Sequence, residues 1–226
     1  MKNKLIFFLV IFLLISALTS LQLQINSKLG IVTDIDGNTY TVVKIHNQLW
    51  TSENLNVSHF RDGSSIPEIK TKEEWAKAGE EGRQGWCYYN DDPENGKKYG
   101  KLYNWFAVND PRGLAPKGWH IPSDEEWTQL TDSLGGIENA GFKMKSDSGW
   151  KNNGNGNNHS LFNGLPGGNC GFTGEINNIG ETGYWWSSTK ASNMRIWVRI
   201  LYYDKNTLGR EKYYKNYGFS VRYIKD

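Results

Sequence analysis

YWWSST at residues 184–189 is followed by RIWVRILYY at 195–203, EKYY at 211–214 and YGFSVRYI at 217–224. These runs are rich in aromatic and β-branched residues, which are enriched in β-strands. In the second run, Ile196, Val198 and Ile200 alternate with Trp, Arg and Leu, as a strand with two different faces requires. No long alternation of strands and helices precedes the runs, so a parallel, doubly wound sheet is not expected. The end of the chain therefore predicts the terminal strands of a twisted antiparallel sheet.

Residues 146–183, directly before these runs, are dominated by Gly, Asn and Ser. A stretch with so few aliphatic residues cannot supply regular core elements, so we expect a long, largely irregular loop region. Long ordered loops in a compact domain are often functional. The predicted loop is therefore a first place to look for a binding site.

Helices are expected to be few and short. The clearest one begins after Ser123, where Ser123 and Glu126 have the spacing of a capping box, and ends at Gly135-Gly136. This element gives the acidic residues 124–126 a structural role, so they are not taken as a catalytic set. Other short helices are expected at residues 71–78, 102–108 and 137–144, and strands at 31–34, 39–45 and 48–52. The fold class predicted from these elements is α+β.

The N-terminal segment predicts export. Lys2 and Lys4 precede an unbroken apolar run at residues 5–15, and small residues follow at 16–20. This is the pattern of a cleavable secretory signal peptide, and the run is short for a transmembrane helix. An uncleaved membrane anchor is the alternative. We expect a signal peptide at 1–20, a linker at 21–30 and one domain at 31–226, located in the periplasm, on the cell surface or outside the cell.

The charge balance argues against a nucleic-acid partner. Lys2 and Lys4 are two of the 26 basic residues, so the remainder of the chain has 24 basic and 24 acidic residues. Nucleic acids and anionic membranes are bound through clustered Lys and Arg, and no such cluster is present. We therefore expect no nucleic-acid partner and no membrane contact beyond the signal segment, and the sequence does not indicate an oligomeric state.

Cys87 and Cys170 are the two cysteines of the chain. In an oxidising compartment two cysteines more often pair than remain free, so a disulfide between them is expected. One reactive thiol and one bystander is the alternative.

Ten tryptophans in a chain of this size exceed ordinary usage, and most of them are expected in the core. Trp150 lies in polar, Gly-rich sequence, and strand alternation in Trp185-Trp186 would leave one of the two rings exposed. One or two of these rings could form a stacking platform for a sugar.

Amide and carboxylate side chains are dense between residues 163 and 181. Asn169, Glu175 and Glu181 offer oxygen atoms suited to sugar hydroxyls or to a hard cation such as Ca²⁺. Asn and Gly at this density are also ordinary turn formers, and EF-hand spacing is absent. The candidate ligand-binding residues are therefore Trp150, Asn169, Glu175, Glu181, Trp185 and Trp186, with Ca²⁺ as an optional cofactor.

Catalytic signatures are missing from the sequence. The four histidines show no H-E-x-x-H spacing, and neither a G-x-S-x-G elbow nor a P-loop occurs. Acidic residues are plentiful, but nothing selects one pair of them as a glycosidase couple. We expect a protein that is not an enzyme.

Several ordered blocks resemble one known family, the Fibrobacter succinogenes major paralogous domain family. They include Asp36-Gly37-Asn38 with Tyr40, residues 48–50, 53–55, 99–105, 116–123, 165–168 and 183–188, and the closing block 218–222. The resemblance covers residues 31–226 and implies an exported or surface protein of Bacteroidota-like bacteria. Many members carry Cys where this chain has Ala115 and Tyr223. That departure implies that one family disulfide is missing and leaves Cys87 and Cys170 as the alternative pair.

The W-S-S segment at 186–188 and the block G-F-S-V-R at 218–222 are also similar to the C-type-lectin-like fold. That fold houses the formylglycine-generating sulfatase-modifying family as well. The likeness implies either extracellular ligand binding or a redox-cysteine enzyme, and neither cysteine lies in a recognisable catalytic motif. The expected function is an exported, non-catalytic binding module for a glycan or a cell-surface protein. A polysaccharide-active enzyme and a structural subunit of a surface assembly are the alternatives.

Overall fold

The computed structural model describes residues 28–226. The expected signal peptide at 1–20 lies outside the described residues, as does the expected linker apart from its last three residues. Among the helices of residues 28–226, none has the length and apolar character needed to cross a bilayer.

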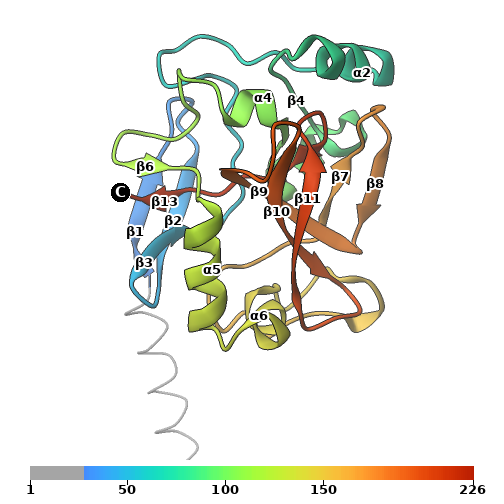
Figure 1. The fold of residues 1–226 in the computed structure, drawn as a ribbon. Helices are drawn as coiled ribbons and strands as arrows, with labels where there is room; N and C mark the ends of the chain where they lie inside the picture. The colour runs from blue at the N-terminus through green and yellow to red at the C-terminus, as the bar shows by residue number, and fades with distance from the viewer. Residues whose placement is uncertain (1–27) are drawn as a thin grey trace, which may run out of the picture.

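The architecture is α+β, with two twisted and mainly antiparallel sheets (Figure 1). The smaller sheet has the strand order β1 (Lys28–Thr33), β2 (Thr39–Ile45), β3 (Gln48–Thr51), β13 (Ile224–Lys225) and β6 (Trp119–His120). The larger sheet has the order β11 (Leu208–Tyr214), β10 (Arg195–Tyr202), β9 (Thr182–Lys190), β7 (Gly167–Cys170), β12 (Gly218–Phe219), β5 (Leu102–Asn104) and β4 (Trp86–Cys87). β8 (Ile176–Ile179) lies off this path and pairs antiparallel with β7. The predicted antiparallel strands are confirmed, but they belong to two sheets.

The C-terminal segment joins the two sheets. The expected single strand at 217–224 is split, since Gly218 pairs with Cys170 and Asn104 in the larger sheet, whereas Ile224 pairs with Trp50 and His120 in the smaller one. Between these pairings the chain crosses from one sheet to the other.

Short helices cover the sheets: α2 (Lys72–Glu81), α3 (Pro93–Tyr99), α4 (Trp105–Val108), α5 (Asp124–Ser133) and α6 (Ile137–Met144). The capping box is confirmed, because the Ser123 side chain accepts from Glu126 N and the Glu126 side chain accepts from Ser123 N. The helix expected at 102–108 is shorter. Asn104 ends a strand and caps α4, accepting a hydrogen bond from Ala107 N.

The larger sheet is buried on both faces along most of its central strand β9. Adjacent side chains Trp185 and Trp186 are both fully buried, in two different apolar clusters. Trp185 packs with Phe162 at a ring-centroid distance of 5.5 Å, towards α5 and α6. Trp186 packs with Phe219 at 4.6 Å on the other face. A third cluster lies under α2 and contains Trp75 and both cysteines.

Arg222, in the segment that crosses between the sheets, is a fully buried cation. Its guanidinium donates to the backbone carbonyls of Thr51, Phe162 and Asn163 and to the side-chain oxygen of Asn54. Burial lowers the pKa of Arg222 to about 9. The same Asn54 oxygen accepts from Trp185 Nε1 at 2.8 Å. The Arg222 side chain thus connects, by hydrogen bonds, segments of loop and strand that are distant in sequence.

Two buried lysines bind the backbone in the same way. Lys145 Nζ donates to the carbonyls of Gly154, Tyr202 and Lys205. Lys101 Nζ donates to Asn56 O and Ser58 Oγ and lies 4.1 Å from the centre of the Trp86 ring. Burial lowers the pKa of Lys101 to about 8. These cations donate to partly buried carbonyls in loops and at the end of a strand.

His120 connects the residue after β13 with helix α5 by two hydrogen bonds. Its Nδ1 is 2.7 Å from Asp226 Oδ1 and its Nε2 is 2.8 Å from Glu126 Oε1. Burial opposes a charge on the ring, but the hydrogen bonds to the two carboxylates outweigh it and raise the pKa of His120 above its ordinary value. The imidazolium therefore links β6, α5 and the end of the described chain.

Arg222→Met should lower the free energy of unfolding by at least about 3 kcal/mol, because each buried acceptor left without a donor costs about 1–3 kcal/mol. The matched control is Arg210→Met, which removes a 40 % exposed arginine side chain paired with Asp124 and should cost less than about 1 kcal/mol. Urea denaturation measures both values. Similar losses in the two variants would contradict the role assigned to Arg222.

The pH dependence of stability should report His120. Since its folded-state pKa is raised, its contribution to the free energy of unfolding is complete below about pH 6.5 and is lost as the pH rises through the raised pKa. Urea midpoints of the native chain should therefore fall between weakly acidic and weakly alkaline pH by more than those of His120→Gln. Equal pH slopes for the two proteins would show that this imidazole is not the titrating group.

Candidate functional site

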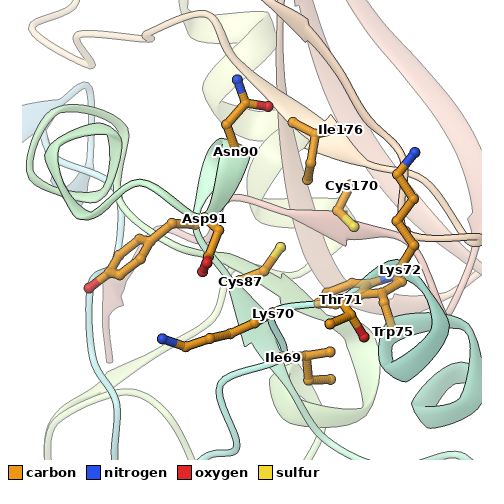
Figure 2. A pocket seen from close by; sticks show the side chains of 12 residues that line it. Ile69, Lys70, Thr71, Lys72, Trp75, Cys87, Asn90, Asp91, Cys170 and Ile176 are labelled. Carbon is orange, nitrogen blue, oxygen red and sulfur yellow. The ribbon is translucent and has the colours of Figure 1, made fainter.

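An open cavity of about 290 Å³ lies between α2, β4 and the β7–β8 hairpin (Figure 2). Its floor is formed by Trp75, Cys87 and Cys170, which all belong to the apolar cluster under α2. Lysine, amide and carboxylate side chains line the remainder of the cavity, including Lys70, Lys72, Asn90 and Asp91. The cavity thus combines an apolar floor with polar walls.

Helix α2 positions one wall. Thr71 caps the helix by accepting a hydrogen bond from Glu74 N at 3.2 Å. One turn further, Trp75 points inward and its Nε1 donates to Asn216 O at 2.9 Å. Lys72 starts the helix and is exposed at the cavity.

Two glycines allow the walls to approach closely. A Cβ on Gly218 would lie 2.8 Å from the Trp75 ring and 2.9 Å from Cys170 Cβ, so a larger residue would displace the floor. A Cβ on Gly174, which has a φ of +87°, would lie 2.5 Å from Lys72 Cα. The turn of the β7–β8 hairpin therefore packs directly against the start of α2.

The two cysteines meet at the floor although 83 positions separate Cys87 and Cys170 in sequence. Both are buried, and both side chains line the same cavity. The neighbouring Cys170 thiol, together with burial, raises the pKa of the Cys87 thiol. The structure has both as free thiols, so the expected disulfide is not formed in it. The two cysteines line the same cavity, but their sulfur atoms are not at bonding distance.

The opposite wall follows β4. Tyr88 lies edge-on to Trp86, with ring centroids 5.0 Å apart, and burial raises the pKa of its hydroxyl. The next residues, Asn90 and Asp91, both have left-handed backbone with φ near +55°, a conformation that Asn and Asp adopt more readily than other side chains. This turn brings an amide and a carboxylate to the cavity.

The three tryptophans predicted to contact a ligand do not form this site. Trp150 is 5 % exposed, and Trp185 and Trp186 are fully buried. Their indole N–H groups are bonded inside the protein, to Ser146 Oγ, to Asn54 Oδ1 and to Tyr103 O respectively. The expectation of an exposed stacking platform at these residues is corrected, since strand alternation exposes a ring only when one face of the sheet is open.

The predicted polar residues are divided between two places. Asn169 is a buried residue of β7, and Glu175 is exposed between Gly174 and Ile176, which both line the cavity. Glu181 lies elsewhere and pairs with Lys151 at 2.5 Å. The structure therefore brings Asn169 and Glu175 to the hairpin beside the cavity, and separates them from Glu181.

Metal ligands do not gather in the described part of the chain. Among residues 28–226, no group of three or more His, Cys, Asp or Glu side chains is placed to hold a metal ion. Ca²⁺ normally takes six to eight oxygen ligands, and Asp91 with Asn90 would supply only part of such a set.

The sequence did not single out Trp75, Tyr88, Lys70 or Lys72 as site residues. They come from a short helix and from the segments flanking it, and none lies in a recognised motif. The one available signal was indirect, because the predicted pairing of the two cysteines implied that the segments around residues 87 and 170 are neighbours.

Comparison with known proteins agrees with the ordered sequence blocks. The family model described as the Fibrobacter succinogenes major domain matches residues 43–225. No curated protein and no solved structure matches the chain. The matched region contains both sheets apart from β1 and the start of β2, and it includes the whole cavity. The chain therefore belongs to the Fibrobacter succinogenes major domain family.

Proposed function

We propose that this protein is an exported, non-catalytic binding module and that the cavity between α2 and the β7–β8 hairpin binds one unit of a glycan. The observation that carries the proposal is the composition of the cavity, in which the half-buried aromatic ring of Tyr88 lies in the same wall region as ammonium, amide and carboxylate groups. Sugar rings need both kinds of partner, since their C–H faces pack on aromatic rings and their hydroxyls need hydrogen bonds.

The size of the cavity favours a small ligand. Pockets for small molecules usually have volumes of about 300–1,000 Å³, and this one, at about 290 Å³, lies just below that range. Such a volume suits a terminal or branching sugar better than an extended polysaccharide chain. The polar side chains come from two separate segments, represented by Lys72 and Asp91, so they can bind hydroxyls on different sides of a ligand.

Export and the finer fold assignment belong to the same proposal. The apolar segment at 5–15 supports export, and the block at 218–222 supports a C-type-lectin-like fold. In an oxidising compartment, pairing of Cys87 with Cys170 is part of the proposal as well. A binding module on a cell surface or in the periplasm would meet glycans directly.

Blocking the cavity should abolish binding. We expect the full-length chain to bind a defined set of structures on a glycan array, with and without a chelator. Lys72→Trp places a large ring at the cavity from an exposed helical position and should weaken binding at least about tenfold, which is about 1.4 kcal/mol. Titrations with the best glycan of the array measure this change.

Lys77→Trp is the matched control. Lys77 is exposed on the same helix but does not line the cavity, so this variant should bind as the native chain does. Equal binding by the native chain and both variants would place the site elsewhere. Release of reducing sugar from the bound glycan would contradict a non-catalytic role, and the absence of any bound glycan would contradict the ligand class.

A further inference from the structure

We propose that Cys87 and Cys170 form a thiol–disulfide exchange site at the floor of the cavity, which reacts in the folded protein with small-molecule disulfides. This inference goes beyond glycan binding and does not depend on it. The arrangement differs from that of a purely structural disulfide sealed in a core, because both residues line an open cavity.

The fold places both thiols in the same cavity without a bond between them. Cys87 lies on β4 and Cys170 on β7, and the strands β5 and β12 separate them in the sheet. Both side chains nevertheless turn into the same cavity, where Figure 2 shows them among Trp75, Ile176 and Asp91. Because both thiols face one cavity and belong to one apolar cluster, a disulfide between them would not need the strands to change partners.

The surroundings favour access from the cavity. Lys70 and Lys72, at the cavity, supply positive charge that attracts anionic disulfides. In contrast, the neighbouring Cys170 thiol, burial and Asp91 raise the pKa of the Cys87 thiol and so oppose thiolate formation. Gly218 and Gly174 let Trp75 and the start of α2 pack closely around Cys170 and the hairpin turn, so the open side of the cavity is the approach to the thiols. A cavity of about 290 Å³ is too small to admit a folded protein to this floor.

The exchange takes place in two balanced steps. The thiolate of one cysteine attacks a sulfur of the small disulfide RSSR, which forms a protein–S–S–R bond and releases one RS⁻. The thiolate of the other cysteine then attacks the protein sulfur of this mixed disulfide, which forms the Cys87–Cys170 bond and releases the second RS⁻. The protein loses two electrons and two protons, and RSSR is reduced to two RSH. Small thiols reverse both steps.

Joining the sulfurs would fix β4 to β7 beneath Trp75. The two strands form opposite sides of the cavity floor, so the oxidised and reduced proteins should differ in the shape of the cavity and in the environment of the Trp75 ring. The redox state of the two cysteines would then change the shape of the cavity in which we propose that the sugar binds.

The test uses the full-length chain under native conditions with oxidised glutathione as the probe. Because the chain has two cysteines, every thiol counted belongs to the pair. Intact mass should show the loss of two hydrogen atoms without an added glutathione, and both thiols should become unreactive towards maleimide. Cys87→Ser and Cys170→Ser should each retain one glutathione, since the second step is blocked. Dithiothreitol should restore both thiols without unfolding the protein.

Access through the cavity is tested separately. Lys72→Trp should slow the oxidation at least about tenfold, whereas Lys77→Trp should leave its rate unchanged. The proposal is overturned if the folded chain keeps both thiols while the urea-unfolded chain is oxidised, if oxidation produces linked dimers, or if the two tryptophan variants react at the same rate. None of these measurements involves a glycan, so failure here is distinct from failure of the proposed binding function.

Discussion

The hydrogen bonds from the Arg222 guanidinium to backbone carbonyls are the constraint on which the rest of the fold depends. A chain with long irregular segments buries carbonyl groups that no strand or helix satisfies, and each would be costly without a donor. Arg222, Lys101 and Lys145 supply these donors from the interior. None of the three forms a salt bridge with a carboxylate within the described residues. Buried cationic side chains here donate the hydrogen bonds that regular secondary structure would otherwise supply to these carbonyls.

The cavity is a consequence of this way of folding. The segment that carries Arg222 begins with Gly218, which pairs with Cys170 and leaves room for Trp75 above it. Because that segment is fixed at both ends, in the larger sheet at Gly218 and in the smaller sheet at Ile224, the floor of the cavity cannot slide relative to the core. A rigid floor with polar walls on loops is the usual construction of a ligand site.

The sequence predicted features that depend on neighbouring residues and missed those that depend on distant ones. The capping box of Ser123 and Glu126 is local, and it was found correctly. The burial of both Trp185 and Trp186 depends on what covers each face of β9, which no local pattern records. The cavity combines residues from 69 to 176, and the pairing of Cys87 with Cys170 was the one long-range contact that residue type could suggest.

The family resemblance implies that a disulfide is missing between Ala115 and Tyr223. The structure shows that a hydrogen bond connects the same two stretches of chain. Ala115 and Tyr223 are both buried in the same apolar cluster, and Tyr223 Oη donates to Leu114 O at 2.8 Å. A hydrogen bond from the crossing segment therefore reaches the residue next to Ala115 and joins the same two stretches of chain. This link needs no sulfur. Cys87 and Cys170 lie at the floor of a cavity, so the exchange that we propose there would leave intact the contacts of Arg222 and Tyr223 that join the two sheets.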